Sequence, residues 1–223
     1  MNAWLLGSGG WIPSATRETT CVLVRDGGHA LILDAGSGLR HAPAYLDGVS
    51  RIDIALTHFH LDHVSGLAYL PTLPVAPTIL APGAWLYDRP SEQILGPFSP
   101  FRPAIAELEP AQRLGAFDLS ARAQPRHWHP TAGLRVGDRL ALITDTAYDP
   151  GSAAFAKDVD HLLHEAWSTT GDEGDPSAAE AATVARDAHA RRLTLVHLAP
   201  DADGPALLAQ APGAELGRDG AAL

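Results

Sequence analysis

The sequence predicts an α/β fold, in which short buried strands are combined with a few helices. Short apolar runs recur along the chain between stretches that contain glycine and proline, which is typical of strands and their turns. The run from Pro176 to Arg192 is rich in alanine, has proline in its first turn and ends on basic residues, as a helix does. With 223 residues, of which 46% are hydrophobic, the chain is long enough for a substantial core, and we expect one domain over residues 1–223.

The first part of the chain is expected to contain five strands. They cover residues 4–6, 20–25, 29–34, 52–56 and 78–81. The turn Asp26-Gly27-Gly28 joins two of these runs and predicts a β-hairpin. Residues Leu61 to Leu70 are apolar at helical spacing, although Gly66 weakens a helix there. The only cysteine, Cys21, falls in a strand and is expected to be a buried thiol.

The second part of the chain is also expected to combine strands with helices. Strands are expected at 105–109, 122–128, 134–136, 139–144 and 193–196, and helices at 176–192 and 206–210, with an edge strand in the tail. Residues 82–104 are rich in proline, glycine and serine and form a long excursion, which is either a functional lid or a disordered connection.

The most informative stretch follows the strand at 52–56. It reads Thr57-His58-Phe59-His60-Leu61-Asp62-His63, with three histidines and one aspartate in six residues. Imidazole nitrogens and carboxylate oxygens are ligands for divalent zinc, iron and manganese. In an extended segment His58 and His60 point to the same side and can bind one ion, whereas Asp62 and His63 lie past the bend and can reach a second.

Other polar residues that close apolar strands complete the candidate site. Asp145 and His197 each follow such a strand, where an unpaired polar group is costly to bury. His127 and His129 are both candidates for a further ligand, because side chains two residues apart in a strand share a face.

The segment T-H-F-H-L-D-H resembles the H-x-H-x-D-H signature of the metallo-β-lactamase-fold hydrolases. This resemblance implies a four-layer αββα sandwich with two metal ions at one edge. The segment from His127 to Val136 is similar to the H-x-x-P-x-x-G-Y-R-I of the ribonuclease Z branch, which favours His127 over His129. In Asp34-Ala35-Gly36-Ser37-Gly38, an aspartate at a strand end before glycines can cap a turn, and the resemblance also implies that Asp34 supports the metal-binding loop; the two roles are compatible.

We therefore expect two divalent ions, with zinc favoured and manganese or iron as alternatives. One ion is assigned to His58, His60 and His127, the other to Asp62, His63 and His197, and Asp145 is placed between them. Two such ions lower the pKa of a shared water towards ~7, so that hydroxide is available for hydrolysis. Asp62 is expected to be a catalytic residue as well as a ligand.

A second motif concerns the leaving group. His164-Glu165-Ala166 resembles part of the L-x-H-E-A-T of ribonuclease Z and related phosphodiesterases, which implies that His164 donates a proton to the leaving alkoxide. A structural histidine at a strand end is the alternative. Arg17 is a weaker candidate for contact with a substrate phosphate.

The net charge of the chain limits the classes of substrate that we expect. The chain has 16 basic and 26 acidic residues, a net charge of −10, and an acidic surface does not favour nucleic acid or an anionic membrane. We therefore expect a phosphodiesterase acting on a small phosphodiester. The alternatives are an endoribonuclease of the tRNA 3′-processing type, a lactonase or thioesterase, and a binding module that holds no metal.

Location and assembly are less constrained by the sequence. The N-terminus lacks the basic and apolar regions of a signal peptide, and no run reaches the ~20 apolar residues of a membrane span, so a cytoplasmic enzyme without membrane contact is expected. The oligomeric state is open, with a homodimer as one option.

Overall fold

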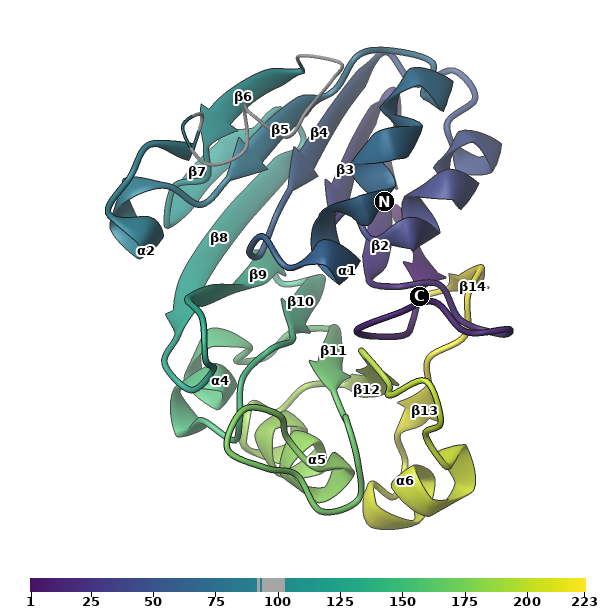
Figure 1. Cartoon of the computed structure of the whole chain (residues 1–223), viewed down its shortest axis with the longest axis vertical. Helices are drawn as coiled ribbons and strands as arrows, with labels where there is room; N and C mark the ends of the chain where they lie inside the picture. The colour runs from purple at the N-terminus through teal and green to yellow at the C-terminus, as the bar shows by residue number, and fades with distance from the viewer. Residues whose placement is uncertain (92, 94–102) are drawn as a thin grey trace.

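Two seven-stranded β-sheets face each other in the computed structural model, which describes residues 1–91, 93 and 103–223 (Figure 1). The first sheet contains β1 (Asn2–Gly7), β2 (Cys21–Asp26), β3 (His29–Leu33), β4 (Arg51–Ala55), β5 (Thr78–Ala81), β6 (Ala104–Glu107) and β14 (Ala221–Ala222), in the order β14-β1-β2-β3-β4-β5-β6. The second contains β7 (Ala111–Leu114), β8 (Phe117–Gln124), β9 (Thr131–Val136), β10 (Leu140–Ile143), β11 (His161–Glu165), β12 (Arg192–Val196) and β13 (Glu215–Leu216), in the order β13-β12-β11-β10-β9-β8-β7.

Helical segments cover the outer faces of both sheets. Against the first sheet lie the 3₁₀ segments η1 (Ser37–Tyr45) and η2 (Ser65–Thr72) with the short helix α1 (Leu61–Val64). Against the second lie α4 (Pro150–Phe155), α5 (Ala178–Asp187) and α6 (Gly204–Gln210). One apolar cluster fills the space between the sheets, and one lies under the helices on each side. The expected four-layer αββα sandwich is confirmed.

Parallel pairing brings several strand ends to one edge of this sandwich. Strands β3, β4 and β5 are parallel neighbours in the first sheet, and β10, β11 and β12 are parallel neighbours in the second. Segments that follow such strands emerge at the same edge of the sheet, which is where ligand sites form in α/β folds. The candidate residues after β4, β10 and β12 therefore meet at one place.

Most expected strands are confirmed, and the exceptions have physical reasons. The hairpin of β2 and β3 is present, and Cys21 is buried. The helix expected over Leu61 to Leu70 is split into α1 and η2, because Gly66 passes close to the backbone of Gly36 and Pro71 lies near the end of η2. The strand expected over residues 122–128 is wrong at its end, because β8 stops at Gln124 and residues 125–130 leave the sheet.

Two other predictions concern residues 82–104 and membrane-spanning helices. The excursion at residues 82–104 contains the short helix α2 (Ala84–Tyr87), but residues 92 and 94–102 lie outside the described part of the chain. Within the described residues, no helix combines the length and apolar character needed to cross a membrane.

Gly66 provides a test of the packing behind the site. A Cβ at this position would lie 2.0 Å from the carbonyl oxygen of Gly36 and 2.7 Å from that of Ala35. We expect Gly66→Ala to lower the free energy of unfolding by about 1–3 kcal/mol, because the backbone must shift to relieve the overlap. Urea unfolding measures this loss. The control is Gly28→Ala, whose Cβ would lie 3.2 Å from the Ser50 hydroxyl and no closer than 3.6 Å to any backbone atom beyond its own residue and its two chain neighbours, and equal stability of the two variants would contradict the prediction.

Candidate metal centre

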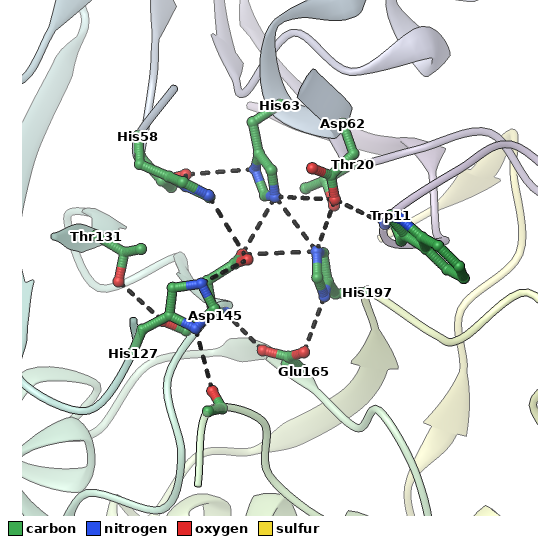
Figure 2. A network of polar contacts seen from close by, with 12 residues as sticks. Trp11, Thr20, His58, Asp62, His63, His127, Thr131, Asp145, Glu165 and His197 are labelled. Atoms are coloured by element: carbon green, nitrogen blue, oxygen red, sulfur yellow. Dashed lines mark hydrogen bonds and ion pairs between the residues drawn. The ribbon is translucent and has the colours of Figure 1, made fainter. Parts of the chain in front are cut away.

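Side chains from both sheets meet in one buried cluster at the edge where the parallel strands end (Figure 2). The Nε2 atom of His63 lies 3.2 Å from His197 Nε2 and 3.1 Å from Asp145 Oδ2. Asp62 Oδ2 lies 3.1 Å from His197 Nε2, and His58 Nε2 lies 3.6 Å from Asp145 Oδ1. Residues separated by as many as 139 positions in the sequence, such as His58 and His197, thus contribute to one centre.

The cluster divides into two groups of potential ligands that adjoin each other. His58, His60 and Asp145 offer atoms within 4.8 Å of one another, and so do Asp62, His63 and His197. His127 lies beside the first group, with its Nε2 atom 3.9 Å from Asp145 Oδ1. Asp145 faces both groups, since its carboxylate approaches His58 on one side and His63 on the other.

Several buried atoms in this cluster have no hydrogen-bond partner among the residues that the structure describes. They are Nε2 of His58, Nε2 of His127 and Oδ2 of Asp145. Buried polar atoms are normally paired, because an unpaired one costs the free energy of its lost hydration. Imidazole nitrogens and carboxylate oxygens that converge without partners fit a divalent cation.

The protonation of two of the histidines is consistent with this interpretation, whereas at His63 and His197 burial lowers the pKa but Asp145 and the other nearby carboxylates raise it further. Burial, together with the neighbouring His63, holds the pKa of His58 well below its usual value. Burial likewise lowers the pKa of His60. Both rings therefore stay neutral at pH 7 and keep a lone pair for a cation. Burial would raise the pKa of Asp62, but His63 and His197 lower it below its usual range, so Asp62 is ionised.

Asp34 supports the histidine loop from the end of β3. Its Oδ1 accepts a hydrogen bond of 2.7 Å from the Thr57 amide, and its Oδ2 lies 2.8 Å from His63 Nδ1. The Thr57 hydroxyl donates to the same carboxylate and lies 2.9 Å from His58 Nδ1. Both ring orientations are thus set by one buried carboxylate, as the resemblance implied.

Glu165 performs the corresponding task on the second sheet. Its Oε1 lies 2.9 Å from His197 Nδ1, and its Oε2 accepts the backbone N–H of Asp145. Burial raises the pKa of Glu165 to about 8, although His197 acts in the opposite direction. Glu165 is not among the site residues predicted from the sequence. Side chains alternate along a strand, so Glu165 points to the opposite side of β11 from His164. This alternation was the signal in the sequence that could have identified Glu165.

The matching family model is that of the metallo-beta-lactamase superfamily, which covers residues 15–180. The chain belongs to this superfamily. A metallo-beta-lactamase-superfamily chain with these His/Asp groups is a metal-dependent hydrolase that binds divalent metal.

Named relatives and solved structures agree with this assignment. Ribonuclease Z of Treponema pallidum is 27% identical over 273 aligned positions, covering 90% of this chain and 87% of the relative. The metallo-beta-lactamase-fold protein YhfI of Bacillus subtilis is 20% identical with a TM-score of 0.86, covering 100% of this chain and 98% of that one. A diphosphatase of the PhnP family is 18% identical with a TM-score of 0.80, covering 100% and 96%.

The structure distinguishes three further candidate residues of this superfamily member, namely His127, His129 and Arg17. His127 lies in the cluster with a nearly buried side chain, and its Nδ1 is 3.3 Å from the carbonyl oxygen of Gly174. His129 is exposed, and its ring lies 5.1 Å from that of His60. The geometry therefore favours His127 as the ligand, while the ligand assignments themselves stay predictions. Arg17 does not line the cleft described below.

His164 does not reach the cluster. Its Nδ1 donates to the carbonyl oxygen of Glu165 at 2.8 Å, and the side chain is fully buried. Alternation along β11 places it on the same face as Leu162, which packs under α5, whereas Glu165 faces the cluster. The resemblance suggested a proton donor, but the structure gives this ring a structural bond instead, so we do not assign it that role.

A cleft of about 580 Å³ leads to the cluster from outside. Cluster residues form its base: His60, Asp62, His127, Asp145 and His197. Its walls are Trp11, Ile12, Leu61, Trp128, Trp167, Asp172 and Asp175. The backbone N–H of Trp11 donates to Asp62 Oδ2 at 2.7 Å, which joins the wall to the base (Figure 2).

Asp34 offers a test of how the loop is held. We expect Asp34→Asn to weaken divalent metal binding by about 10–100-fold, because the amide cannot accept from both Thr57 and His63. Competition with a chromophoric chelator measures the affinity. Asp47→Asn, at an exposed position, serves as the control, and unchanged affinity in Asp34→Asn would contradict the prediction.

His164 offers a test through the pH dependence of stability. Burial lowers its pKa to about 4 in the folded protein, against ~6.5 in an unfolded chain. As the pH falls from about 6.5 to 4, the unfolded chain binds this proton first, so the free energy of unfolding drops by up to about 3 kcal/mol and then levels off. His164→Asn retains an N–H donor near Nδ1 and removes this part of the pH dependence.

Urea unfolding of both proteins between pH 4 and 7 measures the effect. A wild-type protein and a His164→Asn variant with parallel pH profiles would contradict it. Because the ring does not reach the cluster, the variant is also expected to keep its hydrolytic rate at pH 7.

Proposed function

We propose that this metal-dependent hydrolase is a phosphodiesterase that uses two divalent ions, with zinc as the preferred metal and manganese or iron as alternatives. The observation that carries the proposal is the pair of adjoining ligand groups with Asp145 between them. One group would be His58, His60 and His127, and the other Asp62, His63 and His197. Nitrogen and oxygen donors without thiolate suit these metals.

A pair of divalent cations supplies an activated water at neutral pH and Lewis acidity towards both oxygens of an in-line displacement. The residues of the chain perform the remaining tasks. Asp34 and Glu165 fix the rings of His63 and His197, and the Trp11 N–H fixes one oxygen of Asp62. Asp62, ionised and next to His197, is the group placed to accept a proton from water at the base of the cleft.

The substrate class is inferred from the relatives and from charge. Ribonuclease Z, by its name, acts on RNA, whose backbone bonds are phosphodiesters, and this supports phosphodiester chemistry here. The same name supports the alternative of a tRNA-processing endoribonuclease. The net charge of −10 and the two aspartates in the cleft wall oppose a polyanion and favour a small diester.

Metal analysis combined with turnover of bis(p-nitrophenyl) phosphate tests this proposal. We expect about two metal ions per chain, diester hydrolysis, and loss of hydrolysis on chelation with recovery on adding zinc or manganese. Asp145→Asn is expected to lower both metal content and turnover, by at least about 100-fold for turnover. Asp149→Asn, outside the cluster, is the matched control.

Other outcomes identify the alternatives. Hydrolysis of lactones or thioesters without diester turnover would favour an ester hydrolase, cleavage of precursor tRNA in preference to small diesters would favour the endoribonuclease, and absence of metal would indicate a binding module.

A further inference from the structure

Three indoles surround the opening above the cluster, and each lies beside a different residue of the base. The ring of Trp128 is 5.4 Å from that of His127, and the ring of Trp167 is 5.9 Å from that of His197. The backbone N–H of Trp11 itself donates to Asp62. Three of the five tryptophans of the chain thus line one cleft.

Two of these indoles are unusually exposed. Trp11 is 65% exposed and Trp128 is 69% exposed, and Ile12 and Leu61 extend the same apolar wall. Large apolar side chains that gather at a functional cleft mark a binding surface, whereas scattered ones do not. Planar indoles provide stacking faces for a planar ligand, and such stacking tolerates different ring systems.

The shape of the wall around Trp128 indicates that its indole is held in place. A Cβ on Gly174 would lie 3.1 Å from the indole, so the backbone of the 172–175 turn packs against it. The side chain of Asp172 accepts the N–H groups of Gly174 and Asp175 and closes that turn. Glycine at position 174 leaves room for the indole, which keeps its outer face free.

The charge of the wall differs from that of the base. Asp172 and Asp175 line the cleft, and within the described residues no lysine or arginine does. A base with two dications and the carboxylates of Asp62 and Asp145 carries a charge of about +2, which suits one phosphodiester anion. A further anionic group on the substrate would meet the aspartates instead of a cation.

We propose that the cleft selects a phosphodiester that carries a planar aromatic group and only one negative charge, the aromatic group stacking between Trp11 and Trp128. A nucleoside and a simple aryl group share this chemistry. The inference rests on the proposed phosphodiesterase function and names its substrate class. Longer nucleic acids are excluded by their additional phosphates.

Diesters that release the same p-nitrophenolate isolate the contribution of the retained group. Phenyl p-nitrophenyl phosphate and methyl p-nitrophenyl phosphate differ only there, and each rate is divided by the rate in hydroxide alone to remove their different reactivity. We expect kcat/KM for the phenyl ester to be about tenfold higher, since one stacked ring contributes on that scale. Equal normalised values would overturn the proposal.

Variants then assign the preference to the indoles. In Trp128→Ala the phenyl-to-methyl ratio is expected to fall towards one, and likewise in Trp11→Gly, in which glycine accepts the left-handed backbone at φ 63°. Tyr69→Ala removes an exposed aromatic ring that does not line the cleft and is the matched control with an unchanged ratio. Unchanged ratios in both tryptophan variants would overturn the proposal.

Binding provides a readout that does not depend on turnover. Calorimetric titration of the metal-loaded protein with diphenyl phosphate and dimethyl phosphate is expected to give about tenfold tighter binding of the diphenyl compound, lost in Trp128→Ala. If no diester is hydrolysed, the proposed function fails, whereas this titration still decides the inference: equal affinities overturn it, and a preference for diphenyl phosphate supports it.

A final pair of substrates tests the charge requirement. Thymidine 5′-(p-nitrophenyl phosphate) is expected to be hydrolysed about tenfold faster than the same compound with a 3′-phosphate at low salt, with a smaller difference at high salt. Asp172→Asn keeps the oxygen that closes the turn and should reduce the difference, as should Asp175→Asn. Faster hydrolysis of the doubly charged compound, or of oligonucleotides, would overturn this part of the proposal.

Discussion

The arrangement of the whole site depends on one constraint. Imidazoles and carboxylates are buried together, and the described residues supply too few hydrogen-bond partners for them. Within the described part of the chain, no hydrogen bond reaches Nε2 of His58, Nε2 of His127 or Oδ2 of Asp145. Asp34 and Glu165 nevertheless fix the rings of His63 and His197. Removing such groups from water without compensation would consume much of the stability of a domain. A bound divalent cation would provide that compensation and would link metal binding to the folding of this edge, with the ring-orienting carboxylates serving both.

The backbone contributes to the convergence of these side chains. Asp34, Asp145 and His197 follow the ends of β3, β10 and β12, and each adopts a left-handed conformation, with φ of 59°, 56° and 50°. Trp11 does the same with φ of 63°. This conformation costs a non-glycine residue roughly 1 kcal/mol or more, and aspartate and histidine tolerate it better than most. A sharp turn after a strand aims the side chain back over the sheet edge. Four of the seven non-glycine residues with positive φ in the described part of the chain lie at this site, and the others are Asp88, Asp158 and His189.

Much of the fold and many of the site residues could be predicted from the sequence, because strands here are short apolar runs and polar groups after them stand out. His58, Asp145 and His197 are of this kind. Other features depend on tertiary contacts that a sequence pattern does not contain. Glu165 orients the ring of His197, which lies 32 residues away in the sequence. His164 belongs to a motif that implied a catalytic role, but the alternation of side chains along β11 turns it away from the cluster. The close approach of Gly66 to Gly36 likewise explains why a helical pattern became two short segments.

The base and the wall of the cleft meet in shared segments, since His127 of the base adjoins Trp128 of the wall and Leu61 of the wall lies between His60 and Asp62, but the remaining wall residues come from other loops. The base residues follow strands, whose positions are fixed by the sheets. The wall comes from loops: Trp11 from the β1–β2 connection, Trp128 from the β8–β9 connection, and Asp172 and Asp175 from the β11–α5 connection. Loops accept substitution and insertion more readily than strands do. The chain thus combines a superfamily fold, which positions the buried His/Asp cluster, with acidic and aromatic loop residues that border the cleft leading to it.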